Sequence, residues 1–226
     1  MSDHHYDHHD HHDHHDHAGH DHSHDLTPVL QSLLHKEIDF DAIVTLNEAD
    51  PKSGAAIVKK TWAERLNPEP ELQSDTDEQL LMHIPAERRS FTGQAKLHSI
   101  LLCTSNDNSA PMTLKLFRNR DNLDFSAASE VPPTQKLIIP QSSEIVDLPV
   151  NRAHWNMTRS ITLFFEDNYG QGDEDVTRIS YLAFKGEFMA LNREPVTFLY
   201  EAAANPSDHV KIAGVGGINS KIGTGK

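Results

Sequence analysis

The chain has 226 residues, a formal net charge of −14 from 34 acidic and 20 basic residues, and a single cysteine. This length is enough to bury one full hydrophobic core, so we expect one main domain. The excess of acid argues against a nucleic-acid partner, whose phosphates need a basic face, and one cysteine excludes an intrachain disulfide, a cysteine-rich zinc cluster and a CxxC redox motif.

Residues 1–25 form a segment rich in His and Asp, with 12 of the 17 histidines, seven aspartates and no Lys or Arg. It has almost nothing to bury, so we expect it to be disordered. Imidazole is a good ligand for zinc, nickel and copper, but a flexible repeat lacks the fixed surroundings of a built site. We therefore expect adventitious zinc or nickel binding and no required cofactor. The candidate ligands are His4, His5, His8, His9, His11, His12, His14, His15, His17, His20, His22 and His24.

The first ordered elements are expected directly after this segment. Thr27 as an N-cap, the proline that follows it and leucines at helical spacing predict a short packing helix over residues 27–36. An apolar entry strand or turn is expected over residues 38–46, and residues 55–66 should be irregular or a short helix. The apolar run over residues 80–84 predicts the first long strand.

An acidic stretch, residues 73–78, precedes that strand. Its carboxylates Asp75, Asp77 and Glu78 could form a cation site or an acidic contact surface. They could equally lie in a solvated turn in which Ser74 and Asp75 cap backbone amides. The sequence leaves both interpretations open.

Alternating apolar residues predict further strands over residues 96–104, 112–119, 135–139, 143–148 and 196–200. Strict alternation in the first of them would give two faces, with Leu97, Ser99, Leu101 and Cys103 on one and His98, Ile100 and Leu102 on the other. His98 and Cys103 then point apart, which excludes a pair of nucleophile and base. Cys103 is expected to be a small buried apolar residue.

The clearest pattern lies in residues 160–187, where two alternating runs flank a polar loop. We expect a β-hairpin from these runs, inside a two-sheet sandwich with both of its faces covered. The loop, residues 167–175, could chelate calcium through Asp173, Glu174 and Asp175, or be a solvated turn that discourages edge pairing. Arg178 is expected to balance these carboxylates.

Enzyme motifs are missing from the sequence. The C-terminal GVGGINSKIGTGK has Ser220 where a phosphate-binding loop needs its first glycine, and no Ser or Thr follows Lys226. There is no GxSxG nucleophile elbow and no HExxH helix. We therefore expect no catalytic activity.

Several blocks of the sequence, in order, resemble the PITH domain family, the proteasome-interacting module of thioredoxin-like proteins. One block joins Leu163–Phe165, the acidic loop Asp173–Asp175, and Thr177, Arg178, Ile179, Tyr181 and Leu182. Further matching blocks are Leu46, Asn47 and Glu48; Ser74, Asp75, Asp77, Glu78, Leu80, Leu81, Ile84 and Pro85; Lys96, Leu97 and Ser99; Lys115, Leu116, Phe117 and Asn119; and Trp62, Glu64 and Tyr200–His209. The last of these is typical of stand-alone family members without a thioredoxin domain.

The resemblance implies an all-β jelly-roll sandwich, galactose-binding-like and similar to the Doc-type subunit of the anaphase-promoting complex. It implies a PITH domain over residues 26–212, followed by a flexible Gly-rich tail over residues 213–226. The implied function is a non-catalytic protein-interaction module that associates with proteasome subunits of the 26S proteasome or a related assembly. The alternative is a metal-handling protein that acts through the His-rich segment.

The remaining expectations concern the cellular setting. No apolar run approaches the roughly 20 residues that cross a bilayer, and no basic flank with an apolar stretch opens the chain. We expect a monomer without membrane contact, in the reducing environment of the cytoplasm and nucleus.

Overall fold

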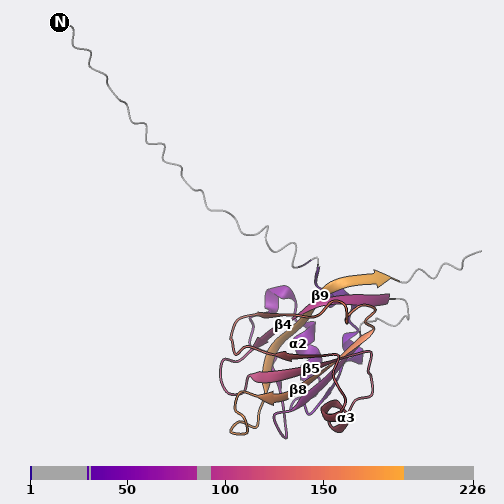
Figure 1. Ribbon diagram of the computed structural model, residues 1–226. Helices are drawn as coiled ribbons and strands as arrows, with labels where there is room; N and C mark the ends of the chain where they lie inside the picture. The colour runs from indigo at the N-terminus through magenta and orange to yellow at the C-terminus, as the bar shows by residue number, and fades with distance from the viewer. Residues whose placement is uncertain (2–29, 31, 86–92, 191–226) are drawn as a thin grey trace, which may run out of the picture. The chain divides into compact units, whose positions relative to one another are not determined.

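A computed structural model describes residue 1, residue 30 and residues 32–85 and 93–190, which form two antiparallel β-sheets (Figure 1). The five-stranded sheet has the order β1 (Val44–Leu46), β3 (Leu80–Pro85), β8 (Ser160–Asn168), β5 (Pro111–Arg118) and β6 (Gln135–Ile138). The four-stranded sheet has the order β2 (Leu72–Gln73), β9 (Arg178–Ala190), β4 (Gly93–Thr104) and β7 (Val146–Pro149). The predicted all-β sandwich is confirmed.

The core lies between the sheets and is built from their inward-facing side chains. Along β8, Ile161, Leu163 and Phe165 all join the main buried cluster, which also includes Leu182 and Phe184 of β9. The period of two therefore predicts the inner face of β8 correctly. Both outer faces are partly covered as well, because Phe164 packs with a smaller cluster that includes Ala128, and Tyr181 packs with one that includes Trp62.

Short helices lie in the segments before and between the strands. They are the 3-10 helices η2 (His35–Glu37), η3 (Phe40–Ala42) and η4 (Trp62–Glu64) and the α-helices α2 (Ser53–Lys59) and α3 (Phe125–Glu130). The helix predicted over residues 27–36 is confirmed at Leu30 and Ser32, which are helical, but it is wrong from Leu33 on. Leu33 bridges Lys185 of β9, and Leu34 donates its N–H to the Phe184 carbonyl, 2.9 Å away. None of the helices in the described residues is long and apolar enough to span a bilayer.

The predicted hairpin over residues 160–187 is also wrong. Its strands exist, but β8 pairs with β3 and β5 in one sheet, whereas β9 pairs with β4 and β2 in the other. The loop between them therefore crosses from sheet to sheet at one end of the sandwich. Alternation within a strand predicts which face is buried, but it does not identify the pairing partner.

Two bulges in the β4–β9 pair change the predicted faces. The register shifts between Leu97 and Ser99, with His98 as the extra residue, and again where Cys103 and Thr104 oppose Tyr181 and Ile179. Leu97 consequently lies in the core with Ile100 and Leu102, and Ile179 lies there with Leu182. Each bulge inserts one residue, which reverses the face of every residue beyond it.

Some of the remaining predicted elements are found in the structure, and others lie outside the described residues. The strands predicted over residues 112–119, 135–139 and 143–148 correspond to β5, β6 and β7 within a few residues, whereas helix α3 was not predicted. The predicted strand over residues 196–200 lies outside the described residues, as do both predicted tails apart from Met1.

Candidate functional site

Three loops meet at the end of the sandwich where β4 and β8 finish and β3, β5 and β9 begin. They are residues 74–79, 105–109 and 169–177. The Ser74 N–H donates to the Thr177 carbonyl at 3.0 Å, and the Thr177 hydroxyl donates to the Glu78 carbonyl at 2.6 Å. The Gly170 N–H donates to the Asn108 carbonyl at 2.9 Å, which ties the third loop to the same end.

We call this region the acidic end and define it as Asp75, Asp77, Glu78, Asp107, Asp173, Glu174 and Asp175. The three loops contain no Lys, Arg or His. The structure thus brings together the two acidic segments predicted from the sequence, although about 100 residues separate them along the chain. One further acidic residue, Asp107, joins the two segments from a loop that the sequence did not single out.

Four of these carboxylates remain available to a partner. Asp75, Asp173 and Asp175 are exposed and Glu78 is half-buried. Within the described part of the chain, these four carboxylates make no hydrogen bond or ion pair. They form the part of the acidic end that can attract a basic surface.

Asn47 holds the first acidic loop in shape. Its backbone has a φ of 66°, a left-handed conformation that Asn tolerates better than most residues. Its side-chain Nδ2 donates to the Gln79 carbonyl at 2.7 Å and to Asp77 Oδ1 at 2.9 Å, and its Oδ1 accepts the Thr76 N–H at 3.0 Å. The loop is therefore built around one amide side chain, which the sequence signals only as part of a family-like block.

Asn168 plays the same part in the loop after β8. This buried side chain accepts the Gly170 N–H at 2.9 Å and donates to the Glu174 carbonyl at 2.9 Å. Glu174 itself bonds the Val176 N–H through Oε1 at 3.3 Å, so its carboxylate supports the loop. Asp173 and Asp175 on either side of it are left facing solvent.

Asp107 supports its own loop in a comparable way. Its Oδ1 accepts bonds from the Ser109 hydroxyl at 2.6 Å, the Ser105 hydroxyl at 2.8 Å and the Ser109 N–H at 2.9 Å. The hydroxyl donors of Ser109 and Ser105 hold the pKa of Asp107 below its usual range. This carboxylate therefore stays charged in the folded protein while serving a structural role.

Arg178 does not balance the acidic loop, contrary to the sequence prediction. Its Nη1 lies 3.2 Å from Glu71 Oε2 and pairs with that residue. Glu71 precedes β2, which pairs with β9 beside Arg178, so the sheet register sets this ion pair. Arg178 still lies near enough to Asp107 to help lower its pKa, but it forms no ion pair with Asp75, Asp173 or Asp175.

The geometry does not favour a cation site at this end. In the described residues, no three His, Cys, Asp or Glu side chains lie close enough together to hold a metal ion. A calcium ion needs six to eight oxygens, so the calcium interpretation of residues 167–175 lacks its ligand set. The candidate metal-binding histidines of residues 4–24 lie outside the described residues.

The thiol of Cys103 and the imidazole of His98 do not pair, as predicted, but the predicted division of the strand into two faces is wrong. Leu97 lies in the core with Ile100 and Leu102, whereas Cys103 lies in an outer cluster. Cys103 is buried and its Sγ donates to the Ser143 carbonyl at 3.4 Å, whereas His98 Nε2 lies 3.7 Å from Glu187 Oε1. The imidazole of His98 is therefore not placed to act as a base for Cys103.

A hollow of about 160 Å³ on the five-stranded sheet contains a second group of polar residues. His83 lies there with Nδ1 3.1 Å from Thr162 Oγ1 and Nε2 3.9 Å from Asp121 Oδ1. The Thr162 hydroxyl donates to the Arg120 carbonyl at 2.5 Å, so its proton is used to join two segments. Burial lowers the pKa of His83, and nearby Asp121 opposes that shift. This arrangement is that of a satisfied structural histidine.

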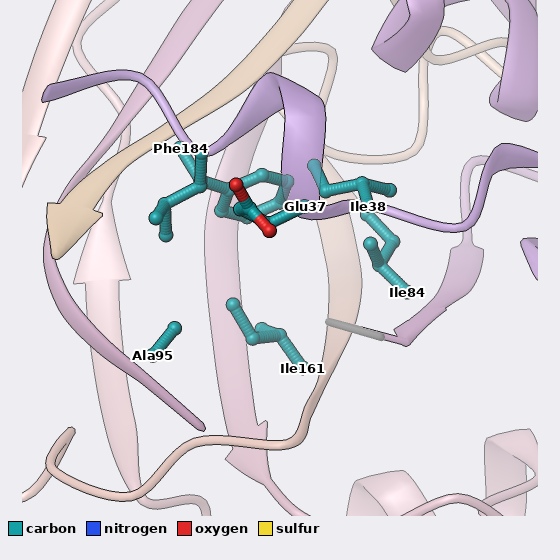
Figure 2. Close-up of a pocket in the computed structure, with 7 residues that line it drawn as sticks. Glu37, Ile38, Ile84, Ala95, Ile161 and Phe184 are labelled. Atoms are coloured by element: carbon teal, nitrogen blue, oxygen red, sulfur yellow. The ribbon is translucent and has the colours of Figure 1, made fainter. Parts of the chain in front are cut away.

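The open edge of the core forms a smaller cavity (Figure 2), where the Glu37 carboxylate lies among Phe184, Ile38 and other apolar side chains. Its volume is about 20 Å³, which is room for a single water molecule. A cavity of this size cannot bind a metabolite, so this cavity is not a candidate for a ligand site.

Comparisons with known proteins point to one family. The model of the PITH domain family matches residues 24–204. A PITH domain-containing protein of Schizosaccharomyces pombe is 36% identical over 186 residues, covering 81% of this chain and 84% of the relative. One from Drosophila melanogaster is 32% identical, covering 87% and 95%, and human PITH domain-containing protein 1 is 29% identical, covering 78% and 80%. These matches confirm the resemblance found in the sequence.

Among solved structures, the family 32 carbohydrate-binding module of NanJ from Clostridium perfringens, in complex with galactose, has a TM-score of 0.47 and 8% identity. It covers 70% of this chain and 98% of that module. The first two such modules of ZmpB from the same organism give a TM-score of 0.48 with 10% identity, covering 73% of this chain and 40% of theirs.

Proposed function

Because the chain belongs to the PITH domain family, we propose that it is a non-catalytic protein-interaction module whose acidic end binds a basic surface of a partner protein. One observation carries this proposal: Asp75, Glu78, Asp173 and Asp175 meet at one end of the sandwich without a basic side chain among the three loops. Unopposed charge of one sign steers a complementary partner and speeds its association. The partner that the family resemblance suggests is the 26S proteasome or a related regulatory assembly.

The test reverses charge at the two best-placed carboxylates, Asp173→Lys with Asp175→Lys. Both side chains are exposed and support no loop, so the fold should be unaffected. The matched control reverses Asp41 and Glu130, which are also exposed and lie in other loops and helices. We expect the first variant to recover roughly tenfold less proteasome from lysate than the control, since two reversed charges remove attraction and add repulsion.

Raising the salt concentration should lower recovery by the natural protein more than recovery by the Asp173 and Asp175 variant, because salt screens only the attraction that is still present. Equal recovery by both variants, with unchanged circular dichroism, would rule out the acidic end as the contact surface. If the acidic end recovered a different assembly, the protein would still be an interaction module, but its partner would not be the proteasome.

The alternative of metal handling is tested by removing residues 1–23. The family match begins at residue 24, which separates most of the His-rich segment from the domain. We expect the truncated protein to lose zinc and nickel binding while its thermal midpoint changes by less than about 3 °C, roughly 1 kcal/mol for a domain of this size. Partner recovery should stay the same. A loss of partner binding on truncation would favour the metal-handling function.

We further propose that the protein is a monomer of the cytoplasm and nucleus. The single cysteine is buried, which suits a reducing compartment but does not require one. Light scattering of the purified protein and imaging of a fluorescent fusion would test the two statements separately.

A further inference from the structure

We propose that the opposite end of the sandwich is a second interaction site, which binds an acidic segment of a partner protein. It is formed where β5 ends and β8 begins, whereas the acidic end lies where β5 begins and β8 ends. We call it the arginine end and define it by Arg118, Arg120, Met157, Arg152 and Arg159. This inference does not depend on the function proposed for the acidic end.

Hydrogen bonds of Asn119 and Arg118 join the segment after β5 to the loop before β8. Asn119 Oδ1 accepts the Arg159 N–H at 2.7 Å, and its Nδ2 donates to the Met157 carbonyl at 3.2 Å. Arg118 Nη1 donates to the Asn156 carbonyl at 2.8 Å. Two chain segments about 40 residues apart are thereby fixed side by side, so the backbone positions that carry Arg118 and Arg159 are set by the fold.

The guanidinium groups of this end have no carboxylate partner in the described residues. Two acidic residues lie nearby, but both are engaged. Asp121 accepts the Ser160 hydroxyl at 2.5 Å, and Asp124 caps α3 by accepting the Ala127 N–H at 2.7 Å. Asp121 and Asp124 keep their charge, but four arginines against two aspartates leave this end net positive on a chain with a net charge of −14.

Met157 gives the arginine end an apolar centre. It is 59% exposed, and its φ of 59° lies in the left-handed region, which is unusual for a residue with a long side chain. Such a conformation is strained and is found preferentially at functional sites. A flexible thioether held out among arginines has the composition of an interface centre, where Met and Arg are enriched.

These features favour an acidic peptide as the ligand. The planar guanidinium group binds a carboxylate through two parallel hydrogen bonds, and several arginines in a row can bind successive acidic side chains. Met157 would contact an apolar residue among them. A module with such a site and the acidic end could hold a basic surface and an acidic segment at the same time.

The test measures binding of a fluorescent Glu-rich peptide with one central Leu–Phe pair to the full chain by anisotropy. The probe variant carries Arg152→Glu and Arg159→Glu, since both side chains are exposed and make no contact in the described residues. The control carries Lys36→Glu and Lys59→Glu, which change the net charge equally at exposed positions elsewhere. We expect about a tenfold loss of affinity in the probe variant and less than twofold in the control.

A second variant separates binding from folding. Met157→Gly removes the side chain while relieving the left-handed backbone, so we expect unchanged or higher stability together with several-fold weaker binding. The proposal would be overturned if the arginine and lysine variants lost equal affinity for the Glu-rich peptide, or if Met157→Gly left that affinity unchanged. It would also be overturned if the peptide with every Glu replaced by Gln bound equally well, or if a single-stranded oligonucleotide bound more tightly than the Glu-rich peptide.

Discussion

Replacing Asn47 by Ala is expected to lower the free energy of unfolding by about 3 kcal/mol. The Asn47 side chain makes hydrogen bonds to Thr76, Asp77 and Gln79, and each such bond contributes roughly 0.5–1.5 kcal/mol. Alanine would also sit at a φ of 66°, which adds about 1 kcal/mol of strain. Chemical denaturation monitored by circular dichroism measures the sum.

The same variant should weaken partner binding, because the loop that carries Asp75 and Glu78 loses its central support. Asn47→Gly provides the control, since glycine accepts the left-handed backbone but makes no side-chain bonds. We expect it to lose about 2 kcal/mol, with the difference from Ala reporting the backbone strain. If both variants lost less than about 1 kcal/mol, the loop would not depend on Asn47 as the structure indicates.

Replacing Trp155 by Ala is expected to cost about 3–5 kcal/mol, the range for removing a large buried side chain. Trp155 is fully buried at 0% exposure, and its indole Nε1 donates to Gln135 Oε1 at 3.0 Å. Its backbone carbonyl accepts the Leu97 N–H at 3.2 Å, so the residue also fastens the loop of the arginine end to β4. The thermal midpoint should fall by roughly 10 °C.

His154→Ala is the matched control for this experiment, because His154 is the exposed neighbour of Trp155 in the same loop. Surface changes of this kind usually stay within about 0.5 kcal/mol. Trp155→Phe should fall in between, since it keeps most of the apolar volume and loses the bond to Gln135. Similar midpoints for Trp155→Ala and His154→Ala would show that the loop packs differently from the structure described above.

The sequence predicts the class of fold and most strands because burial follows a period of two. Phe165 and Leu116 point into the core as the alternation requires. The pattern fails at His98 and Ser180, where bulges insert a residue that leaves no mark in the local composition. It also fails to pair β8 and β9 correctly, because neighbours in the chain can belong to different sheets.

The sequence predicts the two acidic segments of the candidate site, but it does not predict that they lie side by side in the fold. Composition identifies the carboxylates of residues 75–78 and 173–175 as exposed. Their meeting at one end depends on contacts such as that of Thr177 with Glu78, which join residues far apart in the chain. The ion pair of Arg178 with Glu71 likewise follows from sheet register, which sequence alone does not define.

The most direct test of the account is zero-length cross-linking of carboxylates to amines in the complex recovered from lysate, with the linked residues mapped by mass spectrometry. The acidic end should supply the links to partner lysines, through Asp75, Glu78, Asp173 or Asp175, which face solvent or are half-buried and carry no other bond in the described residues. Exposed carboxylates elsewhere, such as Asp41 and Glu130, should give none. Links confined to Asp41, Glu130 or other surfaces, with the acidic end unmodified, would contradict the proposed mode of binding.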